Sequence, residues 1–98
     1  TKPETPEGFF LSQNFPNPFN QHTIIQFSLA SKQFVELNIY DITGKHINTL
    51  VSNQIDPGTY SIQWDGTDVQ HREVASGIYF YQLRQNSQKI SRKLLLLK

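Results

Sequence analysis

Apolar and polar residues alternate along much of this chain, with the period of two that is typical of half-buried β-strands. The stretches that show this alternation are 23–29, 35–39 and 59–65. In the last of them Tyr60, Ile62 and Trp64 fall on one face, while serine and glutamine fall on the other. No window of a dozen residues keeps the spacing of an amphipathic helix. The pattern therefore predicts an all-β protein made of antiparallel strands.

Two later segments, 78–83 and 89–98, are apolar on both faces. Such segments are typical of central strands, or of strands whose outer face is covered by a neighbour or a partner. The segment 46–51 fits a turn of helix as well as a strand, because its three apolar residues follow either spacing. We interpret it as a strand, since the turn at Asp41–Gly44 should make it a hairpin with the strand before that turn.

Turn sequences separate these segments at short and nearly regular intervals. Asp41–Gly44 has the composition of a type I turn and predicts a hairpin between the strands on either side of it. Gln85–Ser87 predicts a second hairpin between the last two strands. Asp56–Gly58 is a further turn, and Gly66–Gly77 is a longer loop. This spacing predicts an immunoglobulin-like antiparallel β-sandwich of about seven strands.

The composition limits what such a domain does. Its 98 residues suffice for a single domain, and 37% of them are hydrophobic, which is enough to form a core. There is no cysteine, so disulfides, thiol nucleophiles and thiolate metal sites are excluded. The net charge is +1 and the charged residues are scattered, which does not favour nucleic acid or an anionic membrane as a partner. The longest apolar run, Leu94–Leu97, is far too short to span a bilayer.

The first residues of the chain, TKPETPEG, are polar and include two prolines. This composition is typical of a linker. We therefore expect residues 1–10 to link an upstream passenger to the domain, and residues 11–98 to form the sandwich.

Few side chains in this sequence are candidates for a catalytic role. The three histidines are the only groups that titrate near neutral pH, and they lie on different segments without a metal-ligand spacing. These residues are His22, His46 and His71. No Gly-x-Ser-x-Gly turn and no glycine-rich phosphate loop is present. The sequence therefore predicts no enzyme activity, no catalytic residues and no cofactor.

The sequence also contains residues that suit two kinds of binding site, one for calcium and one for sugars. Asp65 and Asp68 offer carboxylates for a calcium site in the 66–77 loop, but they lack the additional acidic ligands of a dedicated loop, and aspartate is also a common turn residue. Trp64 and several tyrosines offer a stacking platform for sugars. Because Tyr60 and Trp64 share an apolar face, we interpret these aromatic residues as core instead.

Several motifs follow one another in an order and spacing that resembles a known family. They are Leu11–Asn20 (LSQNFPNPFN), Ile39–Gly44 (IYDITG), Pro57–Tyr60 (PGTY), Trp64–Asp68 (WDGTD), Val74–Leu83 (VASGIYFYQL) and Arg92–Lys98 (RKLLLLK). Together they resemble the type A C-terminal sorting domain of the type IX secretion system of Bacteroidetes-type bacteria. They also resemble the related immunoglobulin-like domain of the flagellar hook-assembly protein. The resemblance covers residues 11–98.

The resemblance implies that the domain is a secretion address rather than an enzyme. Such domains end exported proteins, are recognised by an outer-membrane translocon, and are then usually removed by a sortase-like peptidase of the cell surface. The upstream passenger would pass through the periplasm and become secreted or surface-bound. The residues to which the resemblance assigns sorting and recognition are Gly58, Tyr60, Gly77, Tyr79, Lys93 and Lys98. An alternative function is an accessory carbohydrate-binding or spacer module of a secreted hydrolase.

The same residues also have structural explanations. Glycine permits the turns, tyrosine fills the core, and lysine on an edge strand opposes aggregation. Tyr79 matches the corner tyrosine of immunoglobulin-like sandwiches, with Tyr81 where those domains often carry cysteine. His71 stands where the family usually has glycine, and histidine is among the residues that tolerate a positive φ.

Overall fold

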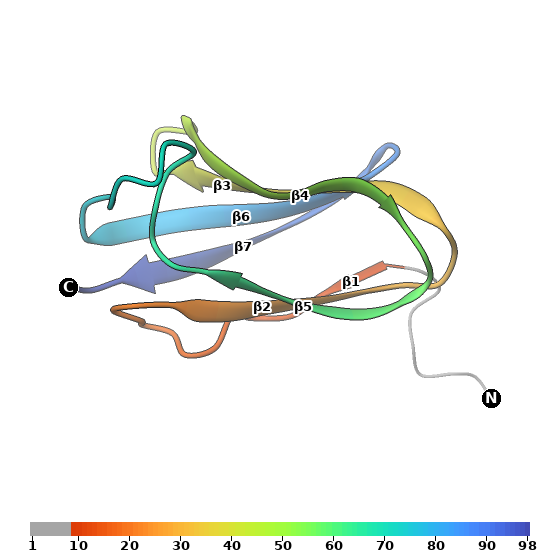
Figure 1. Cartoon of the computed structure of the whole chain (residues 1–98), viewed down its shortest axis with the longest axis horizontal. Helices are drawn as coiled ribbons and strands as arrows, with labels where there is room; N and C mark the ends of the chain where they lie inside the picture. Colours follow the sequence, from red (N-terminus) through yellow and green to blue (C-terminus); the bar gives the residue numbers. More distant parts are fainter. Residues whose placement is uncertain (1–8) are drawn as a thin grey trace.

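The chain folds into a sandwich of two β-sheets, as a computed structural model that describes residues 9–98 shows (Figure 1). No helix occurs among these residues. The seven strands are β1 (Phe9–Leu11), β2 (Thr23–Leu29), β3 (Gln33–Asp41), β4 (His46–Ile55), β5 (Gly58–Trp64), β6 (Gly77–Gln85) and β7 (Gln88–Leu96). The predicted all-β sandwich of about seven strands is therefore confirmed.

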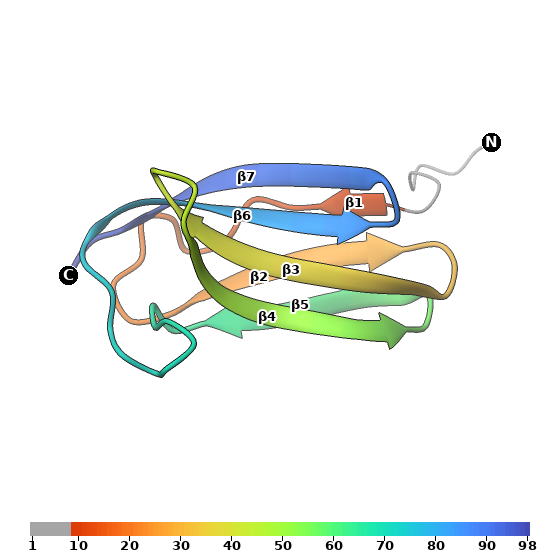
Figure 2. The same ribbon diagram turned by 90° about the horizontal axis from the view of Figure 1, so that it is seen from above.

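The strands are divided between a three-stranded sheet, in the order β1-β2-β5, and a four-stranded sheet, in the order β4-β3-β6-β7. Every pair of neighbouring strands is antiparallel. Viewed from above, the two sheets lie over each other with their strands roughly aligned (Figure 2). This is the packing of immunoglobulin-like sandwiches, in the variety whose fourth strand joins the sheet of the third, sixth and seventh.

The core lies between the sheets and consists of the inward-facing residues of every strand pair. Its fully buried side chains include Ile25, Phe27, Leu37, Ile39, Trp64, Tyr81, Leu83, Leu94 and Leu96. The faces agree with the alternation in the sequence, since Ile62 and Tyr60 of β5 lie opposite Ile25 and Phe27 of β2. A single apolar face on each sheet thus accounts for the fold.

Both predicted hairpins form, between β3 and β4 and between β6 and β7. The segment 46–51 is a strand, and it continues to Ile55 with two irregularities in its pairing to β3. Strand β1 begins at Phe9, so the sandwich includes two residues of the segment that we expected to be a linker. The rest of that segment lies outside the described residues.

Tyrosine hydroxyls tie the loops to the sheets. The Tyr79 hydroxyl donates to the Ala75 carbonyl oxygen at 2.7 Å, which is the tyrosine corner predicted from the sequence. The buried Tyr81 hydroxyl donates to the Ser12 carbonyl oxygen and accepts from the Asn14 backbone N–H, each at 2.8 Å. Burial raises the pKa of Tyr81 to about 12. Tyr81 thus links the two sheets without a disulfide.

Candidate recognition site

The segment between β1 and β2 joins two strands of the three-stranded sheet, and on its way it pairs with the end of β7 in the other sheet. Phe19 forms a parallel bridge with Leu96. Its backbone N–H donates to the Leu95 carbonyl oxygen at 3.1 Å, and its own carbonyl oxygen accepts from the Leu97 N–H at 2.9 Å. The Asn17 Oδ1 accepts from the Leu95 N–H at 3.0 Å. The Asn-Pro-Phe-Asn motif therefore covers the outer edge of the end of β7.

A buried polar network holds this segment in place. The Asn14 amide donates to Thr23 Oγ1 at 3.0 Å and to the Pro16 carbonyl oxygen at 3.2 Å, and the Thr23 hydroxyl donates to the same carbonyl at 2.8 Å. Asn14 and Thr23 are both buried. Because buried polar groups are costly when unpaired, this network favours one conformation of the segment. The peptide bonds before Pro16 and Pro18 are both cis.

The alternation of β7 continues through its three leucines and through Leu97, which follows the strand. Leu94 and Leu96 are buried in the core, whereas Leu95 is half-buried on the outer face and Leu97 is 50% exposed. Two shallow hollows lie on either side of the Pro18 ring. One is lined by Asn17, Pro18, Ile78, Lys93, Leu94 and Leu95, and the other by Pro16, Pro18, Phe19, Asn20 and Leu97.

The same loop presents an exposed phenyl ring. Phe15 is 77% exposed, although its backbone pairs with Ile24 of β2. Phe19, four residues later, is 3% exposed and packs on Trp64 with ring centroids 5.6 Å apart. The motif therefore contains one aromatic residue that anchors it and one that faces solvent. We name the surface formed by Pro16, Pro18, Leu95 and Leu97, which line these two hollows, the loop–strand site.

The residues that the resemblance marks do not gather at one place. Gly77, Tyr79 and Lys98 lie at the end of the sandwich where β7 finishes, since Gly77 pairs with Leu96. Gly58 and Tyr60 lie at the opposite end, since Gly58 pairs with Leu29 at the far end of β2. We refer to these ends as the Leu96 end and the Gly58 end.

The two marked tyrosines both serve the fold. The Tyr60 hydroxyl donates to the Asp56 carbonyl oxygen at 2.7 Å, four residues earlier in the chain, as Tyr79 does to Ala75. The Tyr60 ring stacks on Phe27 at 5.5 Å and the Tyr79 ring packs against the edge of Trp64 at 5.7 Å. The two Gly-x-Tyr elements are therefore matching corners at the two ends of the sandwich.

The two marked lysines differ from each other. Lys93 is exposed on the outer face of β7, where Phe80 of β6 is its partner across the ladder. Lys98 is held at the Leu96 end, where its Nζ lies 3.2 Å from Glu73 Oε1 and its N–H donates to Ser76 Oγ at 3.0 Å. Of the two, Lys93 borders the hollow beside Pro18.

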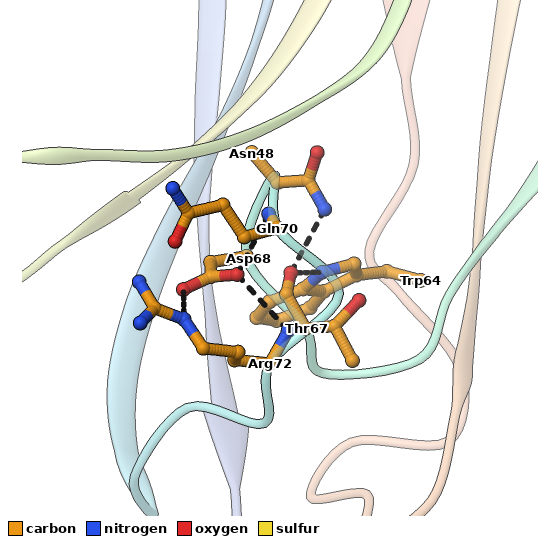
Figure 3. A network of polar contacts seen from close by, with 6 residues as sticks. All are labelled: Asn48, Trp64, Thr67, Asp68, Gln70 and Arg72. Atoms are coloured by element: carbon orange, nitrogen blue, oxygen red, sulfur yellow. Dashed lines mark hydrogen bonds and ion pairs between the residues drawn. The ribbon is translucent and has the colours of Figure 1, made fainter.

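The loop after β5 is closed by hydrogen bonds to its own aspartates, of which Figure 3 shows those of Asp68. Asp68 Oδ1 accepts from the backbone N–H groups of Gln70 and Arg72 at 2.9 and 3.0 Å, and these bonds, with that of Arg72 first, lower the pKa of Asp68. Asp65 Oδ1 accepts from the Thr67 hydroxyl at 2.6 Å. The carboxylates thus act as turn residues here. Across residues 9–98 no three histidine, aspartate or glutamate side chains gather as metal ligands.

Trp64 anchors that loop from within the core. Its indole Nε1–H donates to the Thr67 carbonyl oxygen at 2.9 Å, which also accepts from the Asn48 amide at 2.8 Å (Figure 3). Trp64 is only 1% exposed, so its ring offers no surface on which a sugar could stack. His71 adopts φ 65° in the same loop, which agrees with the positive φ expected at that position.

Sequence reasoning missed the loop–strand site, although it identified both segments that form it. The signal was the run of four leucines at 94–97, because a strand that buries alternate residues must turn the other two outward. The contact with residues 14–20 had no such signal, since it joins segments nearly 80 residues apart in the chain, as the pair Asn17 and Leu95 shows.

The fold is that of a small immunoglobulin-like domain, and the loop before β2 and the end of β7 meet at one end of it. The family of secretion system C-terminal sorting domains matches this chain over residues 13–97, and the chain belongs to that family. Membership implies a C-terminal sorting signal of the type IX secretion system, with export to the cell surface or the extracellular space. No curated protein matches the sequence. Across the part of the chain that the structure describes, no helix is long and apolar enough to cross a membrane.

Solved structures show the same fold at low sequence identity. A dimeric latent PorU from Porphyromonas gingivalis is 22% identical with a TM-score of 0.71, and the match covers 92% of this chain and 9% of PorU. FlgD from Xanthomonas campestris, described as essential for flagellar assembly through hook capping, is 24% identical with a TM-score of 0.61 over 90% of this chain and 66% of FlgD. PorZ, a surface component of the type IX secretion system of P. gingivalis, is 16% identical with a TM-score of 0.55, over 93% of this chain and 12% of PorZ.

Proposed function

We propose that this domain directs an upstream passenger across the outer membrane without catalysis of its own, and that the loop–strand site is the surface that the translocon recognises. The domain is then handed to a sortase-like peptidase at the cell surface. The residues before Phe9, where β1 begins, serve as the link to the passenger, which reaches the site of export through the periplasm.

One observation carries this proposal. The first and the last of the sequence motifs, which lie at opposite ends of the chain, meet at the Leu96 end through Phe19, Asn17 and the end of β7. The surface that they share is lined by Pro16, Pro18, Leu95 and Leu97, and Leu97 is 50% exposed. Exposed apolar groups that gather on a small domain are typical of contacts with other proteins.

The residues marked by the resemblance that lie outside this surface contribute to it indirectly. Tyr79 is 6% exposed and fixes the corner before β6, whose first residue pairs with Leu96. Gly58 and Tyr60 fix the far end of the sandwich. We therefore expect substitutions of the tyrosines to affect sorting through folding, and substitutions of Lys93 to affect it through the surface.

The test is export of a reporter fused to residues 1–98 in a host that has a type IX secretion system. The double variant Leu95→Gln/Leu97→Gln removes apolar side chains that face outward and leaves their backbone hydrogen bonds intact. We expect most of the reporter to remain in the periplasm, while the urea midpoint of the purified domain stays close to that of the parent.

The matched control is Phe34→Gln, because Phe34 is 52% exposed and lies on β3 toward the Gly58 end. We expect this variant to be exported like the parent. Leu96→Ala is a core truncation that costs about 2–5 kcal/mol, so its failure to be exported would report unfolding instead. Normal surface delivery of the Leu95→Gln/Leu97→Gln variant would overturn the proposal.

A further inference from the structure

Strand β5 is a sheet edge without the usual protection of an edge. Residues 48–64, which include the whole of β5, contain one charged residue, Asp56, and that residue lies in the turn before the strand. The other sheet has two edges: β7 carries Lys89, Arg92 and Lys93 and is covered in part by Phe19, and β4 is interrupted by two irregularities in its pairing to β3. Natural edge strands are protected by charge, proline, bulges or a covering segment, since bare edges pair with other strands.

The register shows which backbone groups of β5 face outward. The backbone groups of Gln26 and Ile24 on β2 point away from β5, because they form hydrogen bonds with Ser12 and Phe15. In an antiparallel ladder the bonded residues alternate, so the odd-numbered residues of β2 bond to Tyr60, Ile62 and the other even-numbered residues of β5.

Thr59, Ser61 and Gln63 must then direct their N–H and C=O groups to the free edge. Within residues 9–98 no loop or turn forms a backbone hydrogen bond with these three residues. Their side chains lie on the outer face, where Ser61 and Thr59 continue polar rows from β2. Gln26 Nε2 donates to Ser61 Oγ at 3.1 Å, and Ser28 and Thr59 share a hydrogen bond of 3.2 Å.

On the inner face of β5, the core is incompletely closed. Tyr60 and Ile62 are half-buried, whereas their partners Phe27 and Ile25 on β2 are 1% and 0% exposed. When another strand covers apolar surface that is exposed beside an unpaired edge, the free energy of the system falls. The edge therefore offers both hydrogen-bonding groups and apolar contact.

We propose that two copies of this chain associate through antiparallel pairing of β5 with β5, with Ser61 facing Ser61 of the second copy. In this register Thr59 faces Gln63 of the second copy. Each residue whose backbone groups point to the free edge therefore meets another such residue, with about six backbone hydrogen bonds in total. Tyr60 faces Ile62 of the second copy, which is a favourable pairing of an aromatic with a β-branched side chain.

The neutrality of β5 selects a second copy as its partner. A strand that carries a charge repels its own copy in an antiparallel pair, or needs an opposite charge at the symmetry-related position. Residues 57–64 carry none, and polar rows meet polar rows in the register centred on Ser61. Pairing about a twofold axis is closed, because it uses the free edge of both copies and leaves none for a third. This inference does not depend on the proposed function.

The test is sedimentation equilibrium of residues 1–98 over a wide range of protein concentration. We expect a reversible monomer–dimer equilibrium. Ser61→Pro removes an N–H that faces the free edge and none that bonds to β2, so we expect dimerisation to weaken by at least about tenfold. Ser61→Ala keeps that N–H and is the matched control, for which we expect the dimer to persist.

Charge substitutions test the register independently and do not require proline to be tolerated. In Thr59→Lys/Gln63→Lys each lysine faces a lysine of the second copy, and we expect a monomer. In Thr59→Lys/Gln63→Glu each lysine faces a glutamate, and we expect the dimer to return. A parent chain that is monomeric at every concentration would overturn the proposal, as would dimerisation that neither Ser61→Pro nor Thr59→Lys/Gln63→Lys weakens.

Discussion

At the scale of single residues, tyrosine does in this sandwich what cysteine does in many others. Tyr81 occupies the strand position at which immunoglobulin domains often carry cysteine, and its hydroxyl bonds to the backbone of the segment that leaves the other sheet. The ring fills the core while the hydroxyl satisfies two backbone groups. A fold without any cysteine thereby obtains a fixed connection between its sheets.

Tyr81→Phe tests this connection. The change leaves the Asn14 N–H and the Ser12 carbonyl oxygen without their partner, so we expect the free energy of unfolding to fall by about 1–3 kcal/mol in urea titrations. Tyr60→Phe is the control, because the Asp56 carbonyl oxygen is near solvent and water replaces the hydroxyl. Equal losses in the two variants would contradict a special role for Tyr81.

The alkaline pH dependence gives a second measurement at the same residue. The pKa of Tyr81 is raised to about 12 by burial, whereas an unfolded tyrosine titrates near about 10. Between these values the unfolded chain has lost the proton that the folded chain keeps, so stability is complete below about pH 10 and falls as the pH rises toward 12. We expect this decline to be shallower in Tyr81→Phe, and unchanged steepness would count against the assignment.

At the scale of elements, the segment between β1 and β2 behaves as an eighth, very short strand on the four-stranded sheet. It supplies the parallel partner that the end of β7 otherwise lacks, and Asn14 and Thr23 fix it from beneath. The Asn-Pro-Phe-Asn motif thus has a structural reason as well as a proposed recognition role. The two roles fall on different residues of the segment.

The two phenylalanines of this segment contribute differently to the stability of the fold. Phe19→Ala empties a site against Trp64, so we expect a loss of about 3–5 kcal/mol in the free energy of unfolding. Phe15→Ala changes a side chain that is 77% exposed, and we expect a change within about 0.5 kcal/mol. Urea unfolding of both variants measures the difference. A large loss in Phe15→Ala would mean that Phe15 is part of the fold.

At the scale of the whole molecule, three carboxylates set the stability in acid. Arg84 lowers the pKa of Glu36, the Thr43 hydroxyl lowers that of Asp41, and the Arg72 N–H lowers that of Asp68. Their contribution is complete above the unfolded values, near about pH 4, and is lost as the pH falls through the folded values.

We therefore expect the urea midpoint to be constant near neutral pH and to decline below about pH 4. Asp41→Asn should remove part of this decline, because Asp41 Oδ1 accepts from the backbone N–H groups of Thr43 and Lys45 in the β3–β4 turn. The pH series of the parent and the variant measures it. An identical acid decline in both proteins would contradict the assignment to Asp41.

The sequence predicted the strands well because their pattern is local. Alternation gave the inner faces of β2, β3 and β5, and turn residues gave the two hairpins and the corner at Tyr79. The division into sheets of three and four strands depends on pairings between distant residues, which a single sequence does not record. The loop–strand site was missed for the same reason, since Asn17 and Leu95 meet only in the folded chain.

The placement of β1 and β7 has a mechanical consequence. Phe9 begins β1 at the Gly58 end and Leu96 ends β7 at the opposite end, so tension between the passenger and a partner that holds the last strand acts along the strands. The hydrogen bonds of both terminal ladders are then strained together rather than opened one at a time. Arg92 and Gln13, which bond to the Leu11 and Lys93 carbonyl oxygens, pass the tension directly between the two sheets. If the domain works as proposed, we expect this geometry to resist unfolding under tension while the passenger is drawn through the outer membrane.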